Sequence, residues 1–424
     1  MPDPIYLTQS NVIRGLSSKQ YRALKEMCRY SNNLYNVALY NIRQYFFSQD
    51  CFLTYKNNYH ECKTNDNYKL LQAGVSQQIL KIVDRSFKSF FSLLKKCKTG
   101  DYCYHDVNIP SYRKKDDYFN LICPVNAISI SKGYFKVPMS YAFRKSHPDL
   151  GNILIPYPDR LNGSKIKEVR IIPYDNAKHF KIQYVVLWHQ EPKNIKADNC
   201  MAIDIGVDNF ATCVSNVETP FIIDGRKLKS INQYWNKRKA YLQSRVMKEQ
   251  GMRMTHQITT LTVKRNNRVN DYIKKASRII INNCLENHIG TLYVGYNKGF
   301  KQSVNMGKIN NQNFVQMPFG KFREQLNFLC QTYGIMYKEV EESYTSKSSF
   351  LDNDPLPEYN TEQPYTGTFS GKRIKRGLYK ASDGTLINAD VNGAYNIMRK
   401  GKQNFCKEEL SSGLLESPVR ITIQ

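Results

Sequence analysis

Two aspartates in the second half of the sequence occupy positions where a carboxylate needs a physical reason. Asp204 lies inside the apolar run MAIDIGV, and Asp390 lies in INADVNGAYNI, at the start of a segment of small residues. Burying a carboxylate in an apolar strand costs several kcal/mol unless a cation or hydrogen bonds compensate. As alternatives, Asp204 could pair with an arginine or cap a turn, and Asp390 could be a helix N-cap. Together they are hard oxygen ligands of the kind that bind Mg²⁺ or Mn²⁺.

The two aspartates are far apart in the sequence, so they can meet only if the strand that holds Asp204 packs against the helix near Asp390. The pattern of apolar residues supplies suitable elements in this half of the chain. It predicts strands at 201–209, 210–216, 220–225, 291–295 and 335–341, a long helical region at 226–285, and helices at 318–333 and 391–400. Three strands joined by tight turns, followed by strands that alternate with helices, is the order expected of an RNase H-like α/β sheet.

The first half of the sequence has a different pattern. A helix is predicted to open at Ser17, with Gln20 completing a capping box, and a second helix at about 74–96. Short β-branched and aromatic runs separated by Pro, Gly and Asn follow, which favours a small β-barrel or sheet that the N-terminal strand joins. The polar stretches are predicted to be a loop at 51–70 and a linker at 191–199. We therefore expect a β-barrel domain of residues 1–16 and 101–197, an inserted helical domain of 17–100, an α/β domain of 198–400, and a tail of 401–424 that the pattern describes only as disordered.

The composition points to a polyanionic partner. Lys and Arg number 62 against 36 for Asp and Glu, a net charge of +26, and each phosphate that such a surface neutralises releases a counterion. A merely soluble basic protein and a basic membrane-surface protein are the alternatives. No run of roughly 18 apolar residues occurs and the start lacks a signal sequence, so we expect no membrane partner and an intracellular protein. Its place would be the cytoplasm or nucleoid of a bacterium, or the nucleus if the source is eukaryotic or viral. The eleven cysteines form no CxxC pair, which suits reduced thiols.

The basic charge is concentrated in the predicted helical region at 226–285. This region holds fifteen Lys or Arg against only Glu249 and Asp271, and towards its end apolar residues recur every three or four positions. One face is therefore apolar and the remainder basic. We expect the basic face to grip a nucleic-acid backbone, through Lys237, Arg238, Lys264, Arg265, Arg268, Lys274, Lys275 and Arg278.

Four motifs between residues 200 and 400 resemble, in the same order, the RuvC motifs of the TnpB family: AIDIGVDNFAT, VGYNKGFKQ, ESYTSKSSFLD and INADVNGAYNIM. TnpB proteins are transposon-encoded RNA-guided DNA endonucleases, related to the eukaryotic Fanzor proteins and to type V CRISPR effectors. The resemblance implies a RuvC-type nuclease domain, a guide RNA from the element's end, and a double-stranded DNA target beside a short flanking motif. The barrel and the helical insertion are similar to the family's wedge and recognition regions in architecture alone.

The resemblance also implies a catalytic site with one departure. Asp204 and Asp390 match its first and third carboxylates, but Gly295 stands where most members have the second, a glutamate. Some relatives carry this glutamate on the next strand, which in this chain ends in KEVEESYTSK. Glu341 is our first candidate and Glu342 the second, and side chains that alternate along a strand let only one of them reach the site. The alternative is that both are solvated glutamates at a strand end.

Two Mg²⁺ or Mn²⁺ ions are the cofactors that the resemblance implies. Asp204 would bridge them, Asp390 and Glu341 would each hold one, and hydrolysis of a phosphodiester would leave a 5′-phosphate. Many members carry a four-cysteine zinc finger, but no cysteine occurs from 331 to 405. We therefore predict no zinc and a flexible loop at 348–372 that acts as a flap.

Two further segments have open interpretations. Arg373, Lys375 and Arg376 in KRIKRG could contact phosphate or be a solvated charge run. Tyr344, Thr345 and Ser346 match a YTS element of the family, and they could bind the substrate backbone or cap the segment that follows.

An RNA-guided DNA endonuclease is the function that these observations favour. The alternatives are an RNA-guided DNA-binding protein that no longer cuts, such as a repressor, and an unguided nuclease or transposase. Gly295 favours the first alternative, whereas the carboxylates at 204, 341 and 390 oppose it. An unguided enzyme would have to read bases itself, and no helix-turn-helix or zinc finger is apparent.

Overall fold

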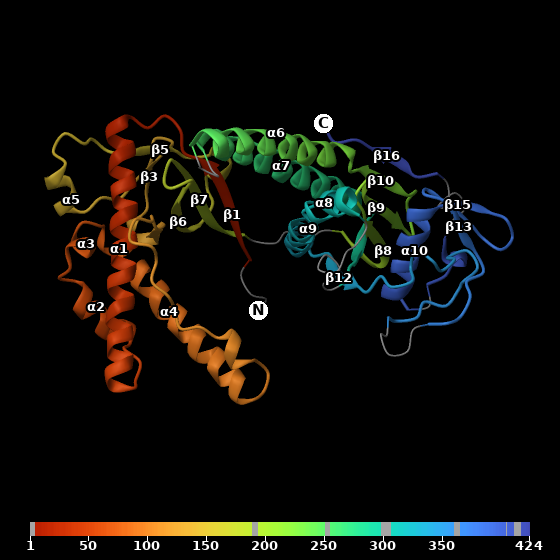
Figure 1. The fold of residues 1–424 in the computed structure, drawn as a ribbon, viewed down its shortest axis with the longest axis horizontal. Coiled ribbons are helices and arrows are strands. Elements are labelled where there is room, and N and C mark those ends of the chain that lie inside the picture. Colours follow the sequence, from red (N-terminus) through yellow and green to blue (C-terminus); the bar gives the residue numbers. More distant parts are fainter. Residues whose placement is uncertain are drawn as a thin grey trace. The chain divides into compact units, whose positions relative to one another are not determined.

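The chain is described by a computed structural model that covers residues 5–188, 194–250, 255–297, 307–359, 365–403, 405–410 and 417–424. It divides into two compact units, Met1–His189 and Gln190–Gln424 (Figure 1). Each unit has a hydrophobic core of its own. Within the part of the chain so described, no helix combines the length and the apolar character that a membrane span requires.

The first unit contains two antiparallel sheets. The larger has the order β1 (Ile5–Val12), β7 (His179–Trp188), β6 (Ile166–Tyr174) and β2 (Leu121–Pro124). The smaller consists of β3 (Ser129–Ser131), β4 (Tyr134–Lys136) and β5 (Leu154–Pro156). The rings of Phe135 and Tyr157 contact the ring of Tyr184 in β7, so the sheets share a core. The N-terminal strand pairs with β7 as predicted, but the described strands form two sheets where a single barrel was expected.

Helices fill the sequence between β1 and β2. They are α1 (Ser18–Gln49), α2 (Tyr55–Cys62), α3 (Asp66–Lys69) and α4 (Ala73–Lys98), with α5 (Tyr141–Ser146) following between β4 and β5. Helix α1 begins at the predicted capping box, since Ser17 Oγ accepts from the Gln20 N–H and Gln20 Oε1 accepts from the Ser17 N–H. The expected loop at 51–70 instead contains α2 and α3, because Thr54 and Asn65 cap their first turns.

The second unit is built on a six-stranded sheet. Its order is β12 (Met336–Val340), β11 (Ile289–Gly295), β8 (Lys196–Ile205), β9 (Asn209–Ser215), β10 (Phe221–Asp224) and β16 (Val419–Ile421). Strands β8, β9 and β10 are antiparallel hairpin neighbours, whereas β11 is parallel to β8 and β12 is parallel to β11. The first five of these strands in the sequence follow the order predicted for an RNase H-like sheet, whereas β16 was not predicted.

The end of the chain is part of this sheet. Strand β16 pairs in parallel with β10, with Val419 opposite Phe221, and Ile423 is buried in the core. The expectation of a disordered tail is therefore wrong for residues 417–424. Residues 404 and 411–416 of the predicted tail lie outside the described residues, as do 191–193 of the predicted linker.

Helices cover both faces of the sheet (Figure 1). They are α6 (Arg226–Gln250), α7 (His256–Glu286), α8 (Lys308–Val315), α9 (Phe319–Tyr333) and α10 (Ala389–Gly401). Side chains of α7 and α9 pack with Met201 and Ile203 on one face, and α10 packs with Ala202 on the other. The long helical region expected at 226–285 is thus two helices packed on each other, the second capped by Thr255.

A small sheet leads into α10. It is formed by β13 (Lys372–Lys375), β14 (Leu378–Lys380) and β15 (Leu386–Asn388). The preceding segment, predicted to be a flexible loop, is anchored where it is described: buried Asp354 accepts from the N–H groups of Ser349 and Ser370, at 2.8 and 3.0 Å. The Phe350 N–H donates to Asn392 Oδ1 of α10 at 2.9 Å. Residues 360–364 of this loop lie outside the described residues.

Candidate active site

Asp204 faces α10 from the centre of the sheet. Side chains alternate along β8, so Asp204 shares a face with Cys200 and Ala202, which pack against α10. A Cβ at Gly393 of α10 would lie 3.2 Å from Asp204 Oδ2, and the glycine therefore lets the helix approach the carboxylate closely. No described residue donates a hydrogen bond to this carboxylate. The alternatives of an Asp–Arg structural pair or a turn cap thus have no direct contact to support them.

Asp390 lies in the first turn of α10, next to the same face. The helix is capped by Asn388, whose side-chain oxygen accepts from the N–H groups of Asp390 and Val391 at 3.0 and 3.2 Å. The alternative that Asp390 is the N-cap is therefore wrong. Its carboxylate instead accepts from Asn209 Nδ2 at 2.6 Å and from Arg373 Nη2 at 3.0 Å.

Glu341 and Glu342 both follow the end of β12 and point to different surroundings. Glu341 has a side chain that is 43% exposed, and it accepts from Lys400 Nζ at 2.6 Å and from the Ser343 N–H at 2.7 Å. Glu342 is largely buried, and no described residue donates to its carboxylate. Its backbone N–H donates to Asn297 Oδ1 at 3.1 Å, which fixes the chain next to the end of β11.

The Glu342 carboxylate and the Ile397 side chain together occupy the space that a side chain at Gly295 would need. Ile203 of β8 pairs with Val294, and Gly295 pairs with Val340 of β12. Gly295 therefore lies between β8, which carries Asp204, and the end of β12, which Glu342 follows. A Cβ at Gly295 would come within 2.8 Å of Glu342 Oε2. This geometry favours Glu342 over Glu341 and reverses the order of preference that the sequence suggested.

The electrostatics separate the two glutamates in the same way. Burial raises the pKa of Glu342 from its ordinary 4.5 to about 7, and the neighbouring Glu341 adds to the effect. Burial also raises the pKa of Asp204 well above its usual range, and the carboxylates of Glu342 and Asp390 contribute. For Glu341, hydrogen bonds from Lys400 and Ser343 outweigh partial burial and lower the pKa.

The donor set fits hard divalent cations. Asp204 and Glu342 are carboxylates with raised pKa values, and no described residue donates a hydrogen bond to them. A cation beside them would stabilise their ionised form. Oxygen-only ligands of this kind suit Mg²⁺ or Mn²⁺. Within the described ranges no three His, Cys, Asp or Glu side chains are already arranged as a metal site, and Arg373 contacts Asp390 on one side.

Comparisons with known proteins cover both the sheet and the segment that carries Glu342 and Asp390. A family described as "Probable transposase" matches residues 183–301, and one described as "Cas12f1-like, TNB domain" matches residues 319–397. The TnpB-like protein ORF457 of Acidianus two-tailed virus is 23% identical over 425 residues, which cover 92% of this chain and 86% of that protein. The chain is therefore similar to a TnpB-like protein over most of its length and to a transposase family over residues 183–301.

The similarity extends to the fold. The Cas12f1 chain of a solved Cas12f1–sgRNA–target DNA complex is similar to this chain with a TM-score of 0.59 at 15% identity, covering 90% of this chain and 83% of the Cas12f1 chain. The chain and the Cas12f1 chain therefore share a fold.

Most of the basic residues predicted to hold nucleic acid are exposed in the structure. Exposed positions include Lys237, Arg238, Lys264, Arg268, Lys274, Lys275 and Arg278. Arg265 differs, because its guanidinium donates to Asn232 Oδ1 at 2.9 and 2.6 Å and lies over the Trp235 ring. Arg265 therefore ties α7 to α6.

The YTS and KRIKRG segments are held by the protein itself. Thr345 is buried and its Oγ1 donates to the carbonyl of Glu342, three residues earlier, at 2.8 Å. Tyr344 packs beside the rings of Tyr365 and Phe369, and Ser346 is exposed. Arg376 pairs with Asp208, as Arg373 pairs with Asp390, whereas Lys375 is exposed.

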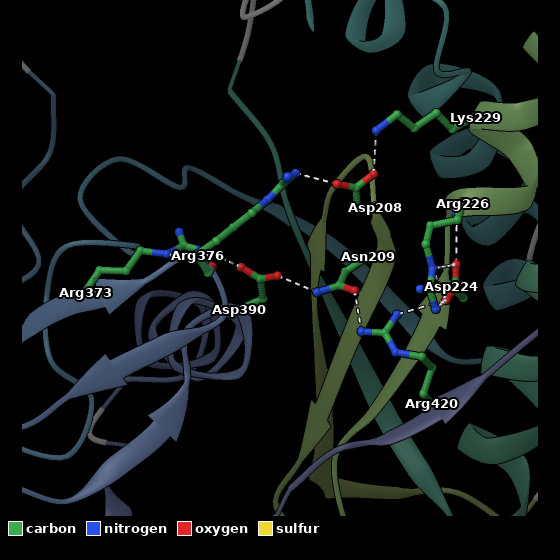
Figure 2. Close-up of polar contacts among 9 residues, drawn as sticks. All are labelled: Asp208, Asn209, Asp224, Arg226, Lys229, Arg373, Arg376, Asp390 and Arg420. Carbon is green, nitrogen blue, oxygen red and sulfur yellow. Dashed lines mark hydrogen bonds and ion pairs between the residues drawn. The ribbon is translucent and has the colours of Figure 1, made fainter. Parts of the chain in front are cut away.

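Several polar residues near the site were not predicted from the sequence. Figure 2 shows Asn209 between Asp390 and Arg420, and Asp208 between Arg376 and Lys229. Asp208 and Asn209 lie inside the motif that carries Asp204, so the sequence could have predicted that they lie near the site. Nothing in the sequence indicated that Arg420 would return to this place.

Proposed function

We propose that this chain is a TnpB-type, transposon-encoded RNA-guided DNA endonuclease with a RuvC-type site formed by Asp204, Glu342 and Asp390. The proposal rests on one observation, which is that the Glu342 carboxylate lies against Gly295. Gly295 ends β11, the strand that pairs with the Asp204 strand β8. A chain that lacked the family's second glutamate without replacing it would be expected to bind DNA and leave it uncut. The half-buried Glu342 carboxylate beside Gly295 supports the proposal that this chain replaces that glutamate.

In this proposal the three carboxylates hold two Mg²⁺ or Mn²⁺ ions. When bound, the ions supply an activated water and stabilise the leaving oxygen of a phosphodiester. The water oxygen would bond to phosphorus as the bond to the 3′ oxygen breaks, the water would give up a proton and the 3′ oxygen would take one up, so that the products are a 5′-phosphate and a 3′-hydroxyl. The protein's own part is to release the Glu342 proton, to keep Asp390 oriented through Asn209, and to let Arg373 leave Asp390.

The partners in this proposal are a guide RNA and a double-stranded DNA target. The exposed cations of α6 and α7 would hold the nucleic-acid backbone, which carries affinity without reading sequence. Support for the partners comes from the Cas12f1 structure, which contains a single-guide RNA and target DNA. Sequence would then be read by base pairing and by a short flanking motif. We propose no zinc, in keeping with the absence of cysteine from 331 to 405.

The test begins with the protein expressed together with its native flanking DNA. RNA that co-purifies is sequenced, reprogrammed to a chosen target, and assayed on a plasmid library with randomised bases beside that target. We expect one RNA species with defined ends, cutting that needs Mg²⁺ and a flanking motif, and no cutting by Asp204→Asn. Cutting without the RNA would indicate an unguided nuclease, and guided binding without cutting an inactive one.

A further inference from the structure

A chain of three hydrogen bonds runs from Asp224 through Arg420 of β16 and Asn209 to Asp390. Asn209 at the start of β9 donates from Nδ2 to Asp390 Oδ2 at 2.6 Å. Its Oδ1 accepts from Arg420 Nη2 of β16 at 2.8 Å, and Arg420 Nη1 donates to Asp224 Oδ2 at 3.1 Å. Figure 2 shows these four side chains in one line between α10 and the edge of the sheet. The segments that carry them lie far apart in the sequence.

The chemistry of the amide gives Arg420 a specific role in this line. An asparagine amide has a donor end and an acceptor end, and a carboxylate such as Asp390 requires the donor. A guanidinium can only donate hydrogen bonds, so Arg420 can bind the Asn209 amide only when Oδ1 faces it. That arrangement directs Nδ2 to Asp390. With Arg420 absent, rotation of the amide by half a turn would place Oδ1 against the carboxylate and repel it.

Asp224 fixes the other side of Arg420. It is 4% exposed, and hydrogen bonds from Arg226, together with one from Arg420, lower its pKa. The parallel pairing of β16 with β10 places Arg420 opposite Ile222, next to Asp224. Arg226 also pairs with Asp224 but makes no contact with Asn209 among the described residues. The two arginines therefore share one anion and differ in their contact with the amide.

We infer that Asn209 and Arg420 are positioning residues for the metal site, with Arg420 orienting the Asn209 amide and the amide holding the Asp390 carboxylate. The inference rests on the proposed function, because it gives Asp390 the role of a metal ligand. It adds that the C-terminal strand is part of the site. Groups that orient a ligand in this way typically change metal affinity by about 10- to 100-fold when they are removed.

The experiment measures Mn²⁺ affinity of the full-length chain by EPR, with Asp390→Asn defining the binding that depends on Asp390. The variants are Asn209→Ala, Arg420→Lys, the double variant, and Arg226→Lys as the matched control. Lysine keeps a positive charge beside Asp224, so the fold is retained, but it lacks the fork that reaches two acceptors. Melting temperature is recorded for each variant.

We expect Asn209→Ala and Arg420→Lys each to weaken the Asp390-dependent binding about tenfold or more. The double variant should bind no more weakly than Asn209→Ala, because Arg420 acts through the amide. Arg226→Lys should bind Mn²⁺ as the unaltered protein does, even if it melts earlier. The guide-programmed cutting rate should follow the same pattern.

Three results would overturn the inference: equal losses in Arg226→Lys and Arg420→Lys, independent losses that multiply in the double variant, or no Mn²⁺ binding that depends on Asp390. The proposed function fails in a different way. If Mn²⁺ affinity follows the expected pattern while the unaltered protein, loaded with its RNA, cuts no DNA, the positioning role stands and the nuclease assignment does not.

Discussion

Replacing Glu342 with glutamine should stabilise the metal-free protein. Burial raises the pKa of Glu342 from 4.5 to about 7, which means that the folded state disfavours the ionised side chain. Glutamine has nearly the same shape and no charge, so the substitution removes this penalty while leaving the packing above Gly295 in place.

The sign and size follow from the two pKa values. An acid with a raised pKa in the folded state contributes fully to stability below about pH 4.5, and this contribution is lost as the pH rises through about 7. The difference between these values, at about 1.4 kcal/mol per pKa unit, corresponds to about 3 kcal/mol. Relative to the unaltered protein, Glu342→Gln should therefore gain about 3 kcal/mol at pH 8 and only about 1 kcal/mol at pH 5.

Urea unfolding in EDTA at these two pH values measures the effect. The chain has two tryptophans, Trp188 in the first unit and Trp235 in the second, so a Trp188→Phe background makes fluorescence report on the unit that holds the site. A gain of about 3 kcal/mol moves the midpoint upward by roughly 1 M urea or more. The same variant should no longer cut DNA.

Glu341→Gln is the matched control, because Glu341 has a lowered pKa and an ion pair with Lys400. It should be slightly less stable than the unaltered protein at pH 8 and should still cut. The reasoning is refuted if Glu342→Gln leaves the pH 8 midpoint unchanged or lowers it, or if its gain is as large at pH 5 as at pH 8.

Three further outcomes are expected. Asp204→Asn and Asp390→Asn should reduce cutting to background while guide and target affinity, measured by filter binding, stays within about twofold, since affinity lies on the basic helices. Replacing Lys264, Arg268 and Lys274 with alanine should reduce the slope of log affinity against log salt by about 0.7–0.9 for each phosphate that is no longer neutralised; Arg265→Ala, a residue held by Asn232, should lower the melting temperature instead. Gly295→Ala should cost about 1–3 kcal/mol in urea unfolding, because its Cβ would lie 2.5 Å from Ile397 Cδ1; an unchanged midpoint would show that the helix yields.

Local patterns were enough to predict the sheet that carries the site. The strands of the second unit are short apolar runs bounded by turns, and their predicted order is the order observed. Asp204 was identifiable because an unpaired carboxylate in an apolar strand is costly whatever the surroundings. Asp390 was identifiable only in combination with Asp204, since an aspartate at a helix start is usually a cap, and the cap is in fact Asn388.

The choice between Glu341 and Glu342 depends on tertiary contacts that sequence does not contain. Strand β12 ends at Val340, so the alternation of side chains no longer fixes which glutamate faces the sheet. Lys400 of α10 binds the Glu341 carboxylate, and this contact favours Glu342 as the ligand in the proposed site. Arg420 is a stronger example, because it follows a stretch without pattern and reaches the site only through strand pairing with β10.

The glycine at position 295 and the position of the Glu342 side chain depend on each other. Parallel neighbours lie about 4.8 Å apart, so a glutamate beyond the end of β12 can reach the position above β11 only if β11 presents no side chain there. The absent Cβ of Gly295 supplies that space, and the Glu342 carboxylate fills it within 2.8 Å. A glutamate introduced at position 295 would therefore clash with both Glu342 and Ile397. It could take over the role of Glu342 only if Glu342 were removed and a smaller residue stood at 397. In the proposed site the second carboxylate therefore comes from beyond the end of β12, and Gly295 of β11 leaves room for it.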